Sequence, residues 1–127
     1  MHEKLLFEYA VLRVVPRVER EEFLNVGVIL YCKKQQFLQT VYHLDATRLA
    51  AFCPKLDIHE IEEYLQAFDR ICKGNAGAGA IGKLDIASRF RWLTATRSTI
   101  VQTSKVHPGF CIDAAIALQK LFAEFVL

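Results

Sequence analysis

The fold is decided by residues 7–44, which read FEYAVLRVVPRVEREEFLNVGVILYCKKQQFLQTVYHL. Three runs in this stretch are rich in the β-branched and aromatic residues typical of strands, namely Phe7–Val15, Asn25–Lys33 and Phe37–Leu44. Pro16 ends the first run because proline cannot donate to a strand ladder. A polar loop at residues 33–36 separates the second run from the third. Three successive strands without intervening helices predict an antiparallel meander and not a parallel βαβ sheet.

The first two runs carry further detail. Side chains alternate along the first run, so one face carries Phe7, Tyr9, Val11, Arg13 and Val15. Gly27, inside the second run, predicts a bulge or a close approach of two backbones.

Capping residues mark two helices in the middle of the chain. Asp45 can cap a short helix that stops near Cys53. Asp57, with a Glu three residues later, resembles a capping box. It opens an amphipathic helix over Ile58–Cys72, which Gly74 ends.

The last third of the chain is less regular. Residues Arg89–Leu93 fit either a short helix or a strand, whereas Ser98–Thr103 is β-branched enough for a strand. Pro108-Gly109 predicts a turn. Asp113 can cap a final helix from Ala114 onward, which we expect to be buried on most of its surface because few of its residues are polar.

These elements predict one domain over residues 1–127. Its fold class is α+β, with a mostly antiparallel sheet of about four strands and the two main helices packed on one face.

Composition indicates a globular protein of the cytoplasm. Hydrophobic residues make up 53% of the chain and charged residues 24%, which excludes a disordered tail. A mean hydropathy of +0.20 indicates either a well-filled core or an exposed apolar patch for a partner. The longest apolar run, Val26–Cys32, is too short to span a bilayer. Glu3 and Glu8 interrupt the apolar start, so we expect no signal peptide.

Several motifs with known chemistry are present only in form. Residues 77–82 match G-x-G-x-x-G, but they follow a helix and not a strand, so we expect a loop and no cofactor. The four cysteines have no metal-site spacing and lie in apolar segments, which predicts reduced structural thiols and no metal. Ser98, His107 and Asp113 could form a triad only by coincidence, because no nucleophile elbow is present.

Charge is distributed unevenly along the chain. Residues 45–69 carry a balance of −4 and residues 83–111 a balance of +4, which indicates an anionic ligand or two segments that face each other. Arg13 stands on a strand face that is otherwise apolar. It therefore either lines an anion pocket or reaches solvent or a carboxylate such as Glu22. Residues 89–107 mix arginine, hydroxyl and aromatic side chains, which suit phosphate recognition or base stacking.

Two stretches carry a resemblance to a known family: YAVLRVVPR running on through EEFLNVGVIL (residues 9–30), and RFRWLTATRSTI running on to HPG (residues 89–109). They resemble a bacterial domain-of-unknown-function family, DUF3037, over essentially the whole chain. The sequence departs from the expected pattern at Thr96 and Lys105, where the family pattern has proline. Residues matching the family motif are Arg13, Arg17, Asn25, Gly27, Arg97, Ser98, Thr99 and His107.

The resemblance implies no activity. It implies a bacterial cytosolic protein that is sometimes encoded beside a HipA-like kinase, which is therefore a candidate partner.

Together these observations favour a non-catalytic accessory or protein-interaction domain. It could also bind a small anion through Arg13, Arg17, Arg97, Ser98, Thr99 and His107. This hypothesis expects Arg13 and Arg97 to converge on one anion. A homo-oligomer stays open, and no membrane partner is expected.

Two alternatives remain. One is a small enzyme for an anionic metabolite, with Arg13 and Arg97 as clamps and His107 as acid or base. The other is a weak nucleic-acid-binding module, for which the pI of 8.4 gives little support.

Overall fold

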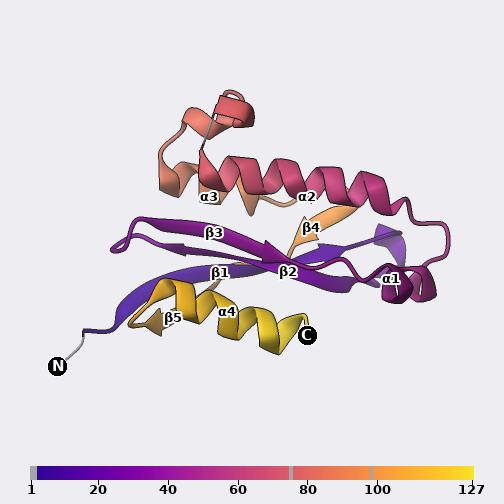
Figure 1. Ribbon diagram of the computed structural model, residues 1–127, viewed down its shortest axis with the longest axis horizontal. Coiled ribbons are helices and arrows are strands. Elements are labelled where there is room, and N and C mark those ends of the chain that lie inside the picture. Colours follow the sequence, from indigo (N-terminus) through magenta and orange to yellow (C-terminus); the bar gives the residue numbers. More distant parts are fainter. Residues whose placement is uncertain (1–2, 75, 98) are drawn as a thin grey trace.

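Strand β1, Leu5–Val14, lies in the middle of one antiparallel sheet (Figure 1). The computed structural model describes residues 3–74, 76–97 and 99–127. In chain order the elements are β1, η1 Val18–Arg20, β2 Leu24–Cys32, β3 Phe37–Tyr42, α1 Ala46–Phe52, α2 Ile58–Lys73, η2 Ala76–Ala78, η3 Ile81–Lys83, α3 Ile86–Leu93, β4 Val101–Thr103, β5 His107–Cys111 and α4 Ala114–Phe125. The predicted α+β class and antiparallel meander are confirmed.

The strand order is β3-β2-β1-β4, and β5 pairs with β1 on the edge that β4 also uses. Strand β4 covers Leu12–Val14 of β1, and β5 covers Leu5–Tyr9. All of these pairings are antiparallel. The sequence prediction missed β5, because Pro108-Gly109 read as a turn. In the structure both residues lie inside this strand, opposite Glu8 and Phe7.

Buried Ser104 joins the two short strands on that edge of β1. Its backbone N–H donates to the Val11 carbonyl at 2.8 Å, and its hydroxyl accepts from the Val11 N–H at 2.8 Å. The side chain thus satisfies a backbone donor that neither β4 nor β5 reaches. One small polar residue therefore keeps the ladder of β1 continuous.

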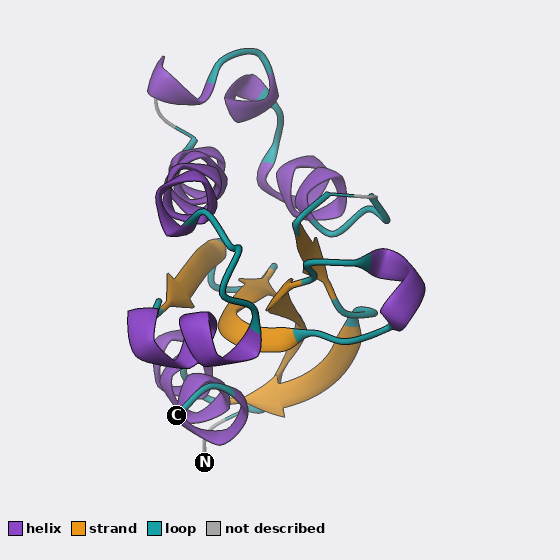
Figure 2. Ribbon diagram, turned by 90° about the vertical axis from the view of Figure 1, so that its right-hand side faces the viewer, coloured by secondary structure: helices purple, strands orange, loops and turns teal. Residues whose placement is uncertain are grey.

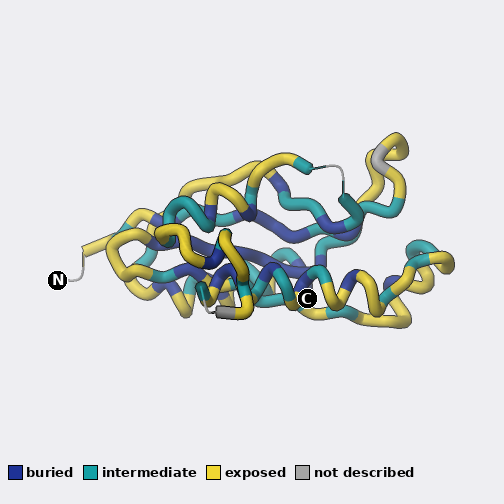
Figure 3. Tube along the Cα trace, turned by 90° about the horizontal axis from the view of Figure 1, so that it is seen from above, coloured by how far each residue is buried: buried dark blue, intermediate teal, exposed yellow. Residues whose placement is uncertain are grey.

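The two main helices cover opposite faces of the sheet, so the prediction that both pack on one face is wrong (Figures 1 and 2). Helices α2 and α3 pack on the face that carries Ala10, Leu12 and Val14. Helix α4 packs on the face that carries Phe7 and Tyr9. Both faces of β1 are apolar, which is why each needs a cover. Seen from above, the buried segments run along the centre of the molecule and the exposed segments lie mostly at its periphery (Figure 3).

A bulge in β2 changes which of its side chains face each layer. The register with β1 shifts between Leu12 and Arg13. As a result Val26 packs with α2, whereas Val28, two residues on, packs against α4. Gly27 lies at this point, and a Cβ there would stand 2.6 Å from the Val41 carbonyl oxygen. The predicted bulge and close approach are confirmed.

The local helix signals hold. Asp45, Asp57 and Asp113 each accept a backbone N–H at the start of α1, α2 and α4. Gly74 ends α2 with φ of 67°. Residues Arg89–Leu93 belong to helix α3, which settles the helix-or-strand alternative. In contrast, the expectation that α4 is mostly buried is wrong, since only Ala114 and Leu118 of its residues are buried.

No helix within residues 3–74, 76–97 and 99–127 is long and apolar enough to cross a membrane.

We predict that Ser104→Ala lowers the free energy of unfolding by about 1–3 kcal/mol, because it leaves the buried Val11 N–H without an acceptor. The matched control is Ser88→Ala on α3, whose hydroxyl contacts the exposed side chains of Asp85 and Arg91. This control should stay within about 0.5 kcal/mol of the parent. Urea unfolding measures both, and equal losses in the two variants would contradict the role of Ser104.

Candidate functional site

Arg13 lies on β1 between Asn25 of β2 and Gln102 of β4. Its guanidinium carbon is 3.9 Å from the centre of the Phe23 ring, a cation–π geometry. Its buried Nε has no hydrogen-bond partner among the described residues, and burial lowers the pKa of the group. Arg13 does not pair with Glu22, which binds Arg20 instead.

Asn25 fixes the face of the sheet on which Arg13 lies. Its Nδ2 donates to the Phe125 carbonyl of α4 at 3.2 Å, so Asn25 faces α4. Arg13 is its direct cross-strand partner and therefore shares that face.

Arg97 lies on the other layer. Its guanidinium stacks on Trp92 of α3, with 4.0 Å from its carbon to the ring centre. It also donates to the carbonyls of Trp92 and Leu93, the last turn of α3. This cation caps a helix C-terminus, where the helix dipole favours positive charge. Arg13 and Arg97 thus contact different rings on opposite sides of the sheet.

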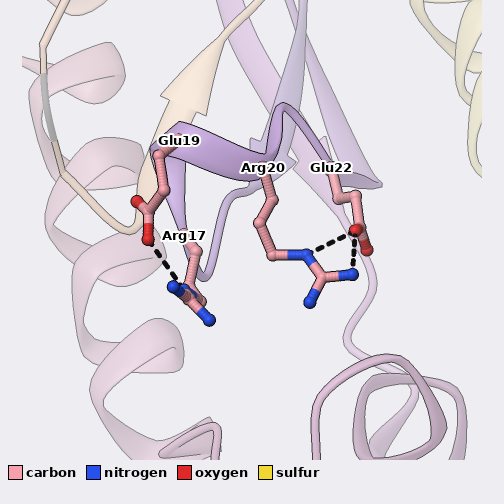
Figure 4. Close-up of polar contacts among 4 residues, drawn as sticks. All are labelled: Arg17, Glu19, Arg20 and Glu22. Atoms are coloured by element: carbon pink, nitrogen blue, oxygen red, sulfur yellow. Dashed lines mark hydrogen bonds and ion pairs between the residues drawn. The ribbon is translucent and has the colours of Figure 1, made fainter.

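Arg17 belongs to a third group of contacts (Figure 4). It pairs with Glu19 at 2.7 Å, and neighbouring Arg20 pairs with Glu22 at 2.7 Å. All four side chains are exposed, so water and salt screen each pair and it adds little to stability. Each guanidinium here already has a carboxylate partner, which leaves little net charge for an external anion.

The remaining predicted residues also have separate contacts. Thr99 donates to the Val101 carbonyl at 2.6 Å and contacts the Tyr64 hydroxyl at 3.3 Å. His107 is exposed on β5, with its ring 5.5 Å from that of Tyr9. Ser98 lies outside the described residues. Anion binding by the whole predicted set stays a prediction, and the structure gives its described members no common contact.

An apolar hollow lies beside α4, where the sequence indicated a turn and a buried helix. We name it the α4 groove; its volume is about 650 Å³. It is lined by Phe7, Phe110, Cys111, Ile112, Asp113, Ile116, Ala117, Lys120, Leu121 and Glu124. Phe110, Ile112 and Ile116 are 68%, 53% and 57% exposed. Ile112 lies just before the Asp113 cap and Ile116 lies in the first turn of α4, so the apolar residues on either side of the cap were the available sequence signal.

Gln35 fixes the end of the α4 groove that lies at the start of α4. Its amide nitrogen donates to the Ile112 carbonyl at 2.9 Å, and its amide oxygen accepts from the Ala114 N–H at 2.9 Å. The β2–β3 turn is thereby joined by two hydrogen bonds to the residues on either side of the Asp113 cap. These hydrogen bonds therefore fix the backbone that carries the exposed isoleucines before any partner binds.

Burial makes two of the cysteines poor nucleophiles. All four are free thiols, as predicted. Burial raises the pKa of Cys72 to about 12, and burial also raises the pKa of Cys111. Thiolate, not thiol, is the nucleophile, so both groups are poor ones at neutral pH. No cluster of three or more potential metal ligands occurs in the part of the chain that the structure describes.

We predict that thiol reagent titrates four cysteines in denatured, unreduced protein and fewer in the native state. Cys72→Ser should remove one thiol from the denatured count and none from the rapid native count, because Cys72 is buried. Cys53→Ser, at a half-buried position, is the matched variant and should lower the native count. A denatured count below four in the parent would reveal a disulfide and contradict the assignment.

Comparison with curated proteins and with solved structures gives no significant match. The family model described as "Protein of unknown function (DUF3037)" matches residues 9–126, nearly the whole chain. That interval includes both sheet edges and the α4 groove apart from its Phe7 wall. The chain therefore belongs to the DUF3037 family.

Proposed function

We propose that this chain is a non-catalytic accessory domain that binds a protein partner through the α4 groove. The observation that carries the proposal is the exposure of three large apolar side chains, Phe110, Ile112 and Ile116, around one hollow. Contiguous exposed apolar surface of this kind is typical of interaction sites. The favourable free energy of binding comes from removing these side chains from water when the partner binds.

The shape of the groove favours a helical segment of the partner. Ile116, Lys120 and Glu124 follow one another at i, i+4 spacing along its wall. From the first to the last of them α4 rises about 12 Å. A partner helix of two to three turns can lie along this wall with its apolar face on Ile116 and Leu121.

Charges at the rim complement such a helix. Lys120 and Glu124 stand one turn apart, with Asp113 at the end of the groove. A partner helix with an acidic and a basic residue beside its apolar face would pair with both. The apolar contact provides the affinity, and these rim charges set the orientation.

The HipA-like kinase is the partner to test, because the family resemblance implies that the two are sometimes encoded together. The alternative of an enzyme is less well supported, since its proposed clamps, Arg13 and Arg97, stack on different rings on opposite layers. Binding of a small anion through these residues has no common geometry to support it.

We predict that Phe110→Lys/Ile116→Lys weakens binding to the proposed partner, a HipA-like kinase, at least about 30-fold, the loss typical of central interface residues. The measurement is calorimetry on the two purified proteins, supported by co-elution in gel filtration.

The matched control is Leu84→Lys, which also places a lysine at an exposed apolar position, away from the groove. It should bind as the parent does. Equal affinity of the groove variant and the parent would contradict the α4 groove as the docking site, and absence of any complex would contradict this partner.

A further inference from the structure

A second hollow lies on the opposite face of the sheet, beneath α3. We name it the basic pocket; its volume is about 340 Å³. Its floor contains Leu6 and Glu8 of β1 and Tyr31 of β2, and its wall is formed by Ala87 and Arg91 of α3. Lys33 and Lys34, from the β2–β3 turn, stand at its edge. In Figure 1 this turn, α3 and the start of β1 lie at the same end of the molecule.

Strand register and helix period place these residues together. Glu8 and Tyr31 are direct cross-strand partners, so their side chains share one face. Leu6 lies two residues before Glu8 and shares it too. Ala87 and Arg91 stand at i, i+4 on α3 and therefore point the same way. The pocket is thus built by two layers of the fold, from segments up to 85 residues apart.

The charges of the lining residues leave a surplus of positive charge. Lys33, Lys34 and Arg91 face one carboxylate, Glu8. Within the described residues none of these three cations forms an ion pair with a protein carboxylate. Within the described residues Arg91 makes a 3.5 Å hydrogen bond to the Ser88 hydroxyl, and it interacts electrostatically with Asp85 without forming an ion pair. In this respect the three cations of the pocket differ from Arg17 and Arg20, each of which forms an ion pair with a glutamate.

The segments that carry the cations are held in position. Gln36 closes the β2–β3 turn with its backbone N–H and its side chain, which donate to the Lys33 carbonyl at 3.1 and 2.8 Å. Gln35 joins the same turn to α4 through two hydrogen bonds. Tyr31, which is buried, packs its ring 5.3 Å from that of Phe90 of α3. Both the floor and the edge are therefore ordered before a ligand arrives, which lowers the entropic cost of binding.

We propose that the basic pocket binds a small phosphate monoester, such as a mononucleotide or a sugar phosphate. Lys33, Lys34 and Arg91 hold the phosphate, and Glu8 accepts a hydrogen bond from a hydroxyl group of the ligand. Leu6, half-exposed, contacts the body of the ligand.

Charge and size select this class. A phosphate monoester carries about −1.5 to −2 charges at pH 7, which matches three cations and one carboxylate. The volume lies at the lower end of small-molecule sites, which span about 300–1,000 Å³. A nucleic acid would need a longer basic track, whereas the whole chain has a net charge of only +2. This site shares no charged residue with the α4 groove.

The test is calorimetry at low salt with adenosine 5′-monophosphate, with adenosine and inorganic phosphate as separate ligands. We expect the monophosphate to bind, inorganic phosphate to bind more weakly and adenosine not to bind. Lys33→Gln/Arg91→Gln should weaken the binding of the monophosphate at least tenfold. Glu8→Gln should increase the affinity for inorganic phosphate several-fold, because it removes a negative charge that repels the phosphate.

The matched control is Lys55→Gln/Lys105→Gln, which removes the same two charges from exposed positions outside the pocket. It should change the affinity less than twofold, and all variants should melt at the temperature of the parent. An equal loss in this control would show a general field effect and overturn the site. Three other results would also overturn the site. They are equal binding of adenosine and the monophosphate, tighter binding of a single-stranded oligonucleotide than of the monophosphate, and no binding of the monophosphate at millimolar concentration.

Discussion

Strand β1 is the element on which the rest of the structure depends, because it is paired on both edges and covered on both faces. Its ten residues pair with β2 on one side and with β4 and β5 on the other. The two outer strands are short, and Ser104 fills the gap between them by bonding both backbone groups of Val11. A buried strand must satisfy every backbone donor and acceptor. Because of this requirement, the last third of the chain pairs with the first strand.

The burial of β1 on both faces explains the three layers and the location of both proposed sites. One row of its side chains needs α2 and α3, and the other row needs α4. At the end formed by the β2–β3 turn the helices do not cover the sheet completely. There Phe110 and Ile116 remain exposed on one side, and Lys33 and Arg91 on the other. Gln35 links the turn to α4, so the two sites share a fixed boundary.

The sites show why a candidate list taken from sequence is incomplete. Arg13 stood out because it interrupts an apolar strand face, and Arg97 because its segment mixes arginine, hydroxyl and aromatic side chains. However, each guanidinium stacks on a nearby aromatic ring, Phe23 or Trp92, which neither pattern reveals. The pairing of Arg17 with Glu19 is local and could have been anticipated from their spacing. The basic pocket could not, because it needs the register of β1 with β2 and the placement of α3.

The sequence by itself determined the elements whose causes are local. Alternation predicted β1 to β3, and Asp57 and Gly74 marked the two ends of α2, because caps and side-chain period act within a few residues. Only the tertiary structure decided that Pro108 and Gly109 lie in a strand and that α4 covers the face opposite α2. Those outcomes depend on pairing with β1, about a hundred residues earlier in the chain. The face that a helix covers depends on the whole fold, because the helix packs against whichever apolar surface the other elements leave uncovered.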